Sequence, residues 1–431
     1  MVSGYCGDGR RVTETKNQKL ETINPKPVFM IRYPAFDPPE YVAWKADPEV
    51  VGQFARTIEK DPARDAVVRQ LESPQLLALY EGLVRNRLHD IALKRWVKQG
   101  VISKAWLGTG EEAATIGPVH ALDHRVASDG LAFDFIAPMI RNAGGCHEMG
   151  MPLADMLRGY LGTADSPTRG RDLHIGDFQR GVLAPISHVG DIMAVSAGVA
   201  LTFKLRREPR VVLTWIGDGS TKSGVFHESM NLAAVQHLPL IVIIQDNKVA
   251  LGTRLDQHHR GSFLDWPAAY GVQGGSFDGN NVLDAYAATR LGADACREGL
   301  GPVLLIADTF RMGGHATHDE REARATFDSK LFSHWGKRDP IGLYETYLIE
   351  GSLDLQSGRS MNQSDARREQ NAAVLRRLEA RVTEEVERAA NEALESARSN
   401  MPIGVSAAEG VYAEAPPTSL VGFAMCEKGL A

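Results

Sequence analysis

The spacing of hydrophobic positions changes along the chain, and each change predicts a different kind of structure. From Ser73 onward, apolar residues recur at helical spacing at positions 76, 77, 79, 83, 88 and 91. Three short apolar runs follow at residues 211–216, 238–244 and 303–307, each bounded by turn residues and separated by helical stretches. This alternation predicts an α/β fold with a mostly parallel sheet and helices on both faces.

The two ends of the chain have a different pattern. Residues 1–70 contain prolines at positions 25, 27, 34, 38 and 39, which predict an extended N-terminal arm that contacts a partner. Residues 71–350 form the predicted main domain. Residues 351–431 read as a polar linker to about residue 370, one long surface helix over residues 374–397 and a loose tail.

Composition narrows the class of protein. With 431 residues, 43% of them hydrophobic, the chain can bury a substantial core. Its 48 basic and 54 acidic side chains give a net charge of -6, and no dense basic run favours nucleic acid or an anionic membrane. The four cysteines form no CxxC pair, and neither a signal segment nor an apolar run of the roughly 20 residues that span a membrane is present. We therefore expect a soluble, cytoplasmic protein.

The strongest chemical signal is the run Gly217-Asp218-Gly219-Ser220. It stands directly after the apolar run 211–216 and before a helical stretch that begins near residue 223. A strand, a glycine turn and a helix in this order direct backbone N–H groups and a helix dipole at a phosphate. Glycine permits a close backbone approach, and Asp218 supplies a hard oxygen for a divalent cation.

A similar triplet, Gly7-Asp8-Gly9, lies in a polar terminus with no strand before it and is expected to be only a turn. The second triplet differs because Asp246-Asn247 follows the next apolar run. Consecutive parallel strands end at one edge of a sheet, so Asp218 and Asn247 are expected to converge on one ion.

The segment 217–253, GDGSTKSGVFHESMNLAAVQHLPLIVIIQDNKVALGT, resembles the thiamine-diphosphate motif of the alpha subunits of 2-oxoacid dehydrogenases, in the pyruvate and branched-chain families. Residues 110–113 (GEEA) resemble a second family signature, and Ile140-Arg141 lies where the family has a diphosphate-binding Tyr-Arg pair. The run from Arg311 to His315 resembles the active-site histidine loop, and residues 335–340 continue the match. The resemblance covers about residues 76–414.

The resemblance implies the thiamine-diphosphate-binding fold and a set of site residues. Mg²⁺ would be held by the side chains of Asp218 and Asn247 and the carbonyl of Val249, and His315 would be catalytic. The remaining cofactor-binding positions, for the phosphates and the aminopyrimidine end, would be Ile140, Arg141, Ser187, Val189, Gly219 and Ser220.

Four departures from the family pattern change the picture locally. Asp246 replaces an asparagine but is not the implied metal ligand, and Ile140 lacks the tyrosine hydroxyl, so that Arg141 must hold phosphate with less help. Trp106 replaces a histidine of the pyruvate-type relatives, which weakens the case for pyruvate. Ala316 stands where animal relatives have a regulatory serine, which excludes phosphorylation at that position.

Each site residue also has a plainer interpretation. A helix cap and a turn asparagine would explain Asp218 and Asn247, a surface ion pair Arg141, and a solvated loop His315. The matching motifs on both sides favour the functional interpretation of these four. For His174, which matches a family histidine, a structural hydrogen bond explains the residue equally well.

The implied function is that of the alpha subunit of a thiamine-diphosphate-dependent 2-oxoacid dehydrogenase, which decarboxylates a branched-chain 2-oxoacid or pyruvate and transfers the acyl group to lipoyl groups of an acyltransferase component. In this family a beta subunit supplies the glutamate that activates the cofactor, and the region after residue 349 has no room for a second domain, so an α2β2 heterotetramer is expected. An acetoin-cleaving or transketolase-like enzyme and a non-catalytic assembly paralogue are alternatives. A dinucleotide oxidoreductase is disfavoured because no strand leads into GxGxxG, and the Walker pattern is absent.

Overall fold

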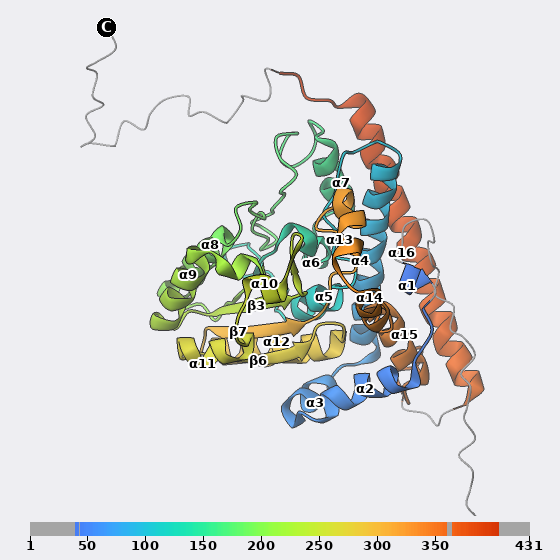
Figure 1. Ribbon diagram of the computed structural model, residues 1–431, viewed down its shortest axis with the longest axis horizontal. Coiled ribbons are helices and arrows are strands. Elements are labelled where there is room, and N and C mark those ends of the chain that lie inside the picture. The colour runs from blue at the N-terminus through green and yellow to red at the C-terminus, as the bar shows by residue number, and fades with distance from the viewer. Residues whose placement is uncertain (1–38, 43, 360–363, 405–431) are drawn as a thin grey trace, which may run out of the picture.

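The computed structural model describes residues 39–42, 44–359 and 364–404 (Figure 1). Within these ranges, five strands form one parallel sheet in the order β1-β2-β3-β7-β6. The strands are β1 (Phe135–Ala137), β2 (Val212–Gly217), β3 (Leu240–Asp246), β6 (Gln273–Asp278) and β7 (Val303–Asp308), and every neighbouring pair runs parallel. The predicted parallel sheet is confirmed.

Helices cover both faces of this sheet, as predicted. The connection from β2 to β3 contains α9 (Gly224–Val235), whereas the connection from β6 to β7 contains α12 (Val282–Arg297) and runs in the opposite direction across the sheet. Because parallel crossovers are right-handed, the two helices lie on opposite faces. Helix α8 (Asp191–Arg206) packs beside α9, and α5 (Ala113–His120) packs beside α12.

The three central strands coincide with the predicted apolar runs to within two residues and are almost entirely buried. The sequence did not predict β1 or β6. Strand β1 is only three residues long, and β6 has the sequence QGGSFD with an exposed edge, so neither presents the apolar run that identifies a buried strand.

A second core lies beside the sheet, between α4 (Ser73–Lys98) and α16 (Asp365–Ser399), which run alongside one another in Figure 1. Helices α7 (Leu153–Leu161) and α15 (Pro340–Glu350) pack against α16 as well. The predicted surface helix over residues 374–397 begins nine residues earlier, where Ser364 caps it by accepting from the N–H of Arg367. It is exposed on one side only, because residues such as Leu375 and Val382 are fully buried.

The prediction of an extended arm is wrong for residues 48–68. These residues form α2 (Pro48–Glu59) and α3 (Pro62–Val68), and a short α1 (Pro39–Val42) precedes them. Asp47 and Asp61 cap the two longer helices, and the proline after each stands at the first helical position, where a missing N–H costs nothing. The proposed arm over residues 1–38, the triplet at residues 7–9 and the tail after residue 404 lie outside the described residues, and the boundaries at 70 and 350 stay predictions.

The remaining elements are short. They are α6 (Ala143–Glu148), α10 (Leu255–His258), α11 (Trp266–Tyr270), α13 (Glu320–Thr326), α14 (Ser329–Gly336), the hairpin of β4 (Val249–Ala250) and β5 (Thr253–Arg254), and the 3-10 turns η1 (Ile140–Asn142), η2 (Ser220–Lys222), η3 (Phe263–Asp265) and η4 (Thr317–Asp319). Among the described helices, none combines the length and the apolar character that a membrane crossing requires.

The segments that follow β1 and β2 pack against different helices. The chain after β1 enters η1 and α6, which packs against α5, whereas the chain after β2 enters η2 and α9 on the other face. In open α/β sheets, ligands bind outside the carboxyl ends of the strands. Arg141 follows β1 and Asp218 follows β2, so both stand at the carboxyl edge of the sheet.

Candidate functional site

The glycine turn after β2 is closed tightly against its neighbours. The N–H of Asp218 donates to the carbonyl of Gln245 in β3 at 3.2 Å, and the Thr221 hydroxyl donates back to the Asp218 carbonyl at 2.6 Å. A Cβ added to Gly219 would lie 2.2 Å from the Cβ of Ala250 in β4. Only glycine therefore permits the β4–β5 hairpin to cover the turn.

The carboxyl group of Asp218 is buried and incompletely bonded. Its residue is 2% exposed, its Oδ1 accepts from the N–H of Gly219 at 2.7 Å, and its Oδ2 has no hydrogen-bond partner among the described residues. Burial, followed by the charges of Asp246 and Glu111, raises the pKa of Asp218 to about 7. Such a carboxyl group, surrounded by other acids, is in the environment that a bound cation would stabilise.

Asn247 stands at the tip of β3, next to the turn that carries Asp218. Its Nδ2 donates to Oε1 of Glu111 at 2.9 Å, and Nε2 of Gln245 donates to the same oxygen at 3.3 Å. The Oδ1 of Asn247 accepts from the N–H of Val249 at 3.4 Å and keeps a second lone pair. Val249, two residues later, is buried at the start of β4.

The predicted juxtaposition of Asp218 and Asn247 agrees with the register of β2 and β3, which pairs Gly217 with Gln245. Asp218 is the next residue after Gly217, and Asn247 is the second residue after Gln245, so both stand at adjacent strand tips. No group of three or more His, Cys, Asp or Glu residues is arranged for a metal within the described ranges. The predicted set contains only one such side chain, Asp218, together with an amide and a backbone carbonyl.

Arg141 is buried, so a surface ion pair is the wrong interpretation. It is 7% exposed and donates through Nη1 to the carbonyl of Leu107 at 2.9 Å and through Nη2 to that of His315 at 3.3 Å. Its Nη1 also lies 3.5 Å from Oε2 of Glu111. Ile140, at the first position of η1, is half-buried beside it.

Arg311 is a second buried guanidinium that the sequence interpretation did not assign to the site. It donates to the carbonyl of Leu251 at 2.8 Å and to that of Gly313 at 3.2 Å. Burial, and next the charge of Arg141, lower the pKa of Arg311 to about 10. A lowered guanidinium pKa indicates that the nearby negative groups do not fully compensate the buried positive charge. Its position four residues after the end of the third apolar run was the signal that could have identified it.

His315 lies in the loop that follows Arg311 and is partly buried, not a fully solvated loop residue. Its N–H donates to Oδ2 of Asp319 at 3.1 Å, and its carbonyl accepts from Arg141. Burial first, then the charges of Arg141 and Arg311, lower the pKa of His315 to about 4. The imidazole is therefore neutral near pH 7 in the chain without ligands.

Ser187 and Val189 lie apart from this buried cluster, on an exposed loop before α8. The end of this loop packs closely against the start of α9, because a Cβ added to Gly190 would lie only 2.3 Å from Oγ of Ser223. The hydroxyl of Ser187 lies 2.9 Å from Nε2 of His174, so His174 does make the hydrogen bond expected of a structural residue.

A buried ionic cluster supports the turn that carries Glu111. The neighbouring Glu112 accepts from the N–H of Gly110 at 2.8 Å and pairs with Nε of Arg87, whose Nη2 lies 3.0 Å from Oδ1 of Asp339. Burial raises the pKa of Glu112 to about 7, although Arg87 acts to lower it. This cluster connects α4, the GEEA segment and the cap of α15, and thereby fixes the position of Glu111.

The structure also shows the surroundings of two residues that differ from the family pattern. Ala316, where a regulatory serine would stand, is 2% exposed. Trp106 is half-buried, with Nζ of Lys104 5.2 Å from the centre of its ring.

Comparison with known proteins gives one consistent result. Residues 81–398 match the family model described as the dehydrogenase E1 component. The chain is 29% identical over 323 residues to the alpha subunit of acetoin:2,6-dichlorophenolindophenol oxidoreductase from Bacillus subtilis, which covers 74% of this chain and 89% of that protein. It is 29% identical over 281 residues to the pyruvate dehydrogenase E1 component subunit alpha of Acholeplasma laidlawii (65% of this chain, 77% of that protein). It is 28% identical over 291 residues to the 2-oxoisovalerate dehydrogenase subunit alpha of Bacillus subtilis (66% and 84%).

Proposed function

The chain belongs to the dehydrogenase E1 component family, and from this premise we propose that it is the alpha subunit of an α2β2 2-oxoacid dehydrogenase that binds thiamine diphosphate through Mg²⁺. The family implies the cofactor and the alpha-subunit names of the relatives imply a beta subunit. The metal, the heterotetramer, a lipoyl-bearing acyltransferase partner and a cytoplasmic location are parts of the proposal.

The single observation that carries the proposal is the presence of incompletely bonded buried acids and buried guanidinium groups at the carboxyl edge of the sheet. Asp218 and Glu111 each have a buried carboxylate oxygen without a hydrogen-bond partner in the described chain, and Arg141 and Arg311 are buried guanidinium groups beside them. A divalent cation together with a diphosphate would satisfy both sets at once. The donor set therefore fits the cofactor.

In the proposed site, Asp218, Asn247 and the carbonyl of Val249 hold Mg²⁺. The phosphates are held by Arg141 and by the turns that contain Ile140, Gly219 and Ser220, and we add Arg311 to this set because it is buried and near enough to Arg141 for the two charges to interact. Ser187 and Val189 would present their backbone to the aminopyrimidine end, and their exposed loop is accessible to a beta subunit that completes the pocket.

When bound, thiamine diphosphate supplies the electron sink that decarboxylation of a 2-oxoacid requires. The residues of this chain position the reactants and control protons. Anion binding would neutralise Arg141 and Arg311, whose charges depress the pKa of His315, and would move this pKa towards the working pH. His315 could then transfer a proton during acyl transfer to a lipoyl thiol.

The activity assay that tests this proposal uses the full chain co-expressed with a beta subunit. We expect decarboxylation of pyruvate or 2-oxoisovalerate only with the beta subunit, thiamine diphosphate and Mg²⁺ all present, and a heterotetramer in gel filtration. Full activity of the chain alone would contradict the α2β2 proposal. If calorimetry detects no binding of thiamine diphosphate to the assembled complex, the result would favour the non-catalytic paralogue.

Acetoin cleavage is a second candidate function. Its support is the acetoin oxidoreductase relative, of which 89% is covered, together with Trp106 at the position of the pyruvate-type histidine. A panel of pyruvate, 2-oxoisovalerate and acetoin with a dye acceptor distinguishes the two functions. Turnover of acetoin alone would select the second candidate.

Replacing Glu111 with alanine should weaken metal binding without touching a proposed ligand. Without Oε1 at 2.9 Å from Nδ2, the amide of Asn247 loses the contact that directs its Oδ1 to the metal. Loss of such a supporting contact lowers metal affinity by about 10–100-fold. Mn²⁺ titration followed by electron paramagnetic resonance, with thiamine diphosphate present, measures the change.

Glu298→Gln, an exposed position beyond α12, serves as the control. Unchanged affinity in Glu111→Ala would show that Asn247 is oriented by other contacts.

A further inference from the structure

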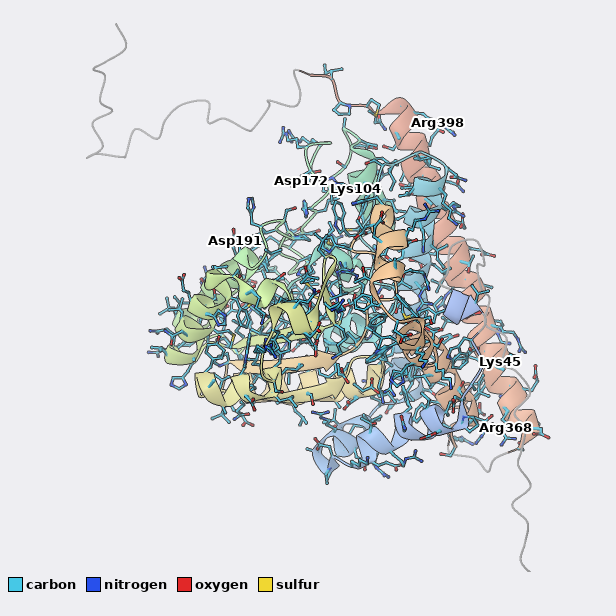
Figure 2. All side chains as sticks on the ribbon, viewed as in Figure 1. Lys45, Lys104, Asp172, Asp191, Arg368 and Arg398 are labelled. Carbon is cyan, nitrogen blue, oxygen red and sulfur yellow. The ribbon has the colours of Figure 1, made fainter. Side chains whose placement is uncertain are left out.

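The imidazole of His258 is buried beside the candidate metal site without a hydrogen-bond partner. Charged side chains such as Asp191 and Arg398 lie at the surface in Figure 2, where water satisfies them. Both ring nitrogens of His258 are instead closed off from solvent, and neither has a hydrogen-bond partner among the described residues. Buried polar atoms are nearly always satisfied, so this pair of nitrogens requires an explanation in the chemistry of the site.

The ring faces the carboxyl group of Asp218. Nε2 of His258 lies 3.9 Å from Oδ2 of Asp218, and this oxygen is also buried and has no hydrogen-bond partner. The separation is too long for a hydrogen bond. In an octahedral site with ligands at about 2.1 Å, adjacent ligand atoms lie about 3.0 Å apart and opposite ones about 4.2 Å apart. The oxygen and the nitrogen are therefore spaced as two ligands of one ion.

Helix α10, which carries His258, is tied to the turn that contains the other proposed ligands. The N–H of Leu255, the first residue of α10, donates to the carbonyl of Lys248 at 3.1 Å, and Lys248 stands between the two other ligand positions, 247 and 249. The N–H of His259 then donates to the carbonyl of Leu255 at 2.9 Å and closes the helix. The position of His258 relative to the metal-binding turn is thus set by backbone hydrogen bonds.

An aromatic cluster packs the segment that follows His258. The ring of His259 is stacked on that of Phe263, with ring centres 3.9 Å apart, and Nδ1 of His259 lies 2.7 Å from Nζ of Lys222. The same Nζ lies 4.9 Å from the ring centres of Phe263 and Trp266. This packing fixes the segment without using the nitrogens of His258.

The proposed ligand set leaves one position of an octahedral ion for a further donor. Asp218, Asn247 and the carbonyl of Val249 supply three oxygens, and a diphosphate supplies two when each phosphate gives one. Mg²⁺ prefers oxygen at the remaining position, whereas an imidazole nitrogen suits transition-metal ions such as Co²⁺ and Ni²⁺. The donor at this position therefore influences which ion the site selects.

We propose that His258 is an additional ligand of the metal site, whose Nε2 binds transition-metal ions directly and shifts the selectivity of the site from Mg²⁺ towards ions such as Co²⁺. With Mg²⁺, water takes the position instead, because this ion keeps water in preference to nitrogen. The inference rests on the proposed thiamine-diphosphate function and adds a ligand and an ion preference to it.

Metal binding to the chain assembled with a beta subunit, with thiamine diphosphate present, tests the proposal. Calorimetry gives the dissociation constants for Mg²⁺ and Co²⁺ in the wild type and in His258→Gln, whose amide offers an oxygen but no imidazole nitrogen. We expect the variant to bind Co²⁺ about 10–100-fold more weakly and to change its affinity for Mg²⁺ by less than about 3-fold. A purely structural role of His258 would lower both affinities together.

Pulsed electron paramagnetic resonance of bound Co²⁺ gives a second readout. We expect the coupling of a directly bound nitrogen in the wild type, altered by isotopic labelling of the histidine nitrogens and absent from His258→Gln. Circular dichroism establishes that the variant is folded. The isotopically labelled wild type keeps the test decisive if the variant does not fold.

His334→Gln, the same substitution at an exposed histidine in α14, is the matched control and should keep the wild-type ratio of the two affinities. A wild type without nitrogen coupling, or a ratio that His258→Gln leaves unchanged, would overturn the inference. Either result, obtained while metal and thiamine diphosphate still bind together, leaves the proposed function standing. No metal-dependent binding of thiamine diphosphate in the wild type would overturn both.

Discussion

Replacing Asp218 with asparagine should make the cofactor-free chain more stable at about pH 8 and should abolish Mg²⁺-dependent binding of thiamine diphosphate. The two effects have one cause, the burial of a carboxyl group that forms no salt bridge with a lysine or arginine of the described chain, although the charge of Arg311 acts to lower its pKa. Its Oδ2 lacks a hydrogen bond, and the nearest histidine nitrogen, Nε2 of His258, is 3.9 Å away.

The sign of the effect on stability follows from the pKa. Burial raises the pKa of Asp218 from 3.8 to about 7, so the folded chain favours the protonated form. The stability contributed by this form is fully present below pH 3.8 and is lost as the pH rises through about 7. The shift corresponds to about 4 kcal/mol at most. Asparagine has a similar shape and no charge, and it avoids this loss.

Urea unfolding of the cofactor-free chain at about pH 5 and about pH 8 measures the first effect, and calorimetry with thiamine diphosphate and Mg²⁺ in the assembled complex measures the second. Asp256→Asn, an exposed position on nearby α10, should change neither quantity by more than about 0.5 kcal/mol. Retained binding by Asp218→Asn, or a less stable variant at high pH, would refute the role assigned to this carboxylate.

Replacing Arg87 with leucine should lower the free energy of unfolding by about 3–5 kcal/mol, because Glu112 and Asp339 would lose the charge that pairs them in a buried site. An exposed pair gives the contrast. Arg69, whose side chain is 72% exposed, pairs with Asp65, and Arg69→Leu should cost less than about 1 kcal/mol.

The deficit of Arg87→Leu should also depend on pH. Arg87 lowers the pKa of Glu112, which burial already raises to about 7. Without the arginine this pKa rises further, and the folded variant must keep Glu112 protonated, a state that becomes costlier as the pH rises above 4.5. The deficit should therefore be larger near pH 8 than near pH 5. Adding Glu112→Gln should recover part of the loss in a double-mutant cycle. An equal deficit at both pH values would contradict this account.

Local sequence was informative wherever one segment contains the whole signal. The central strands are continuous apolar runs because a parallel strand is buried on both faces, and the glycine turn after β2 follows such a run directly. The edge strand β6 could not be recognised, since its exposed QGGSFD sequence resembles a loop. Residues 48–68 were misread because proline disfavours a helix interior but starts a helix at its first position.

By itself, the sequence determined the α/β class and the family, and it predicted the pair Asp218 and Asn247, because the strand, the turn and the tip of the next strand lie within about thirty residues of one another. Only the tertiary structure decided which charges surround that pair. Glu111 and Arg141 come from segments before β2, and Arg311 follows β7. Their approach depends on the strand order and on a buried ionic cluster more than 100 residues away from the turn in sequence. Hydrophobic periodicity indicates which face of an element is buried, but it does not indicate which charged residue from a distant part of the sequence is buried beside it.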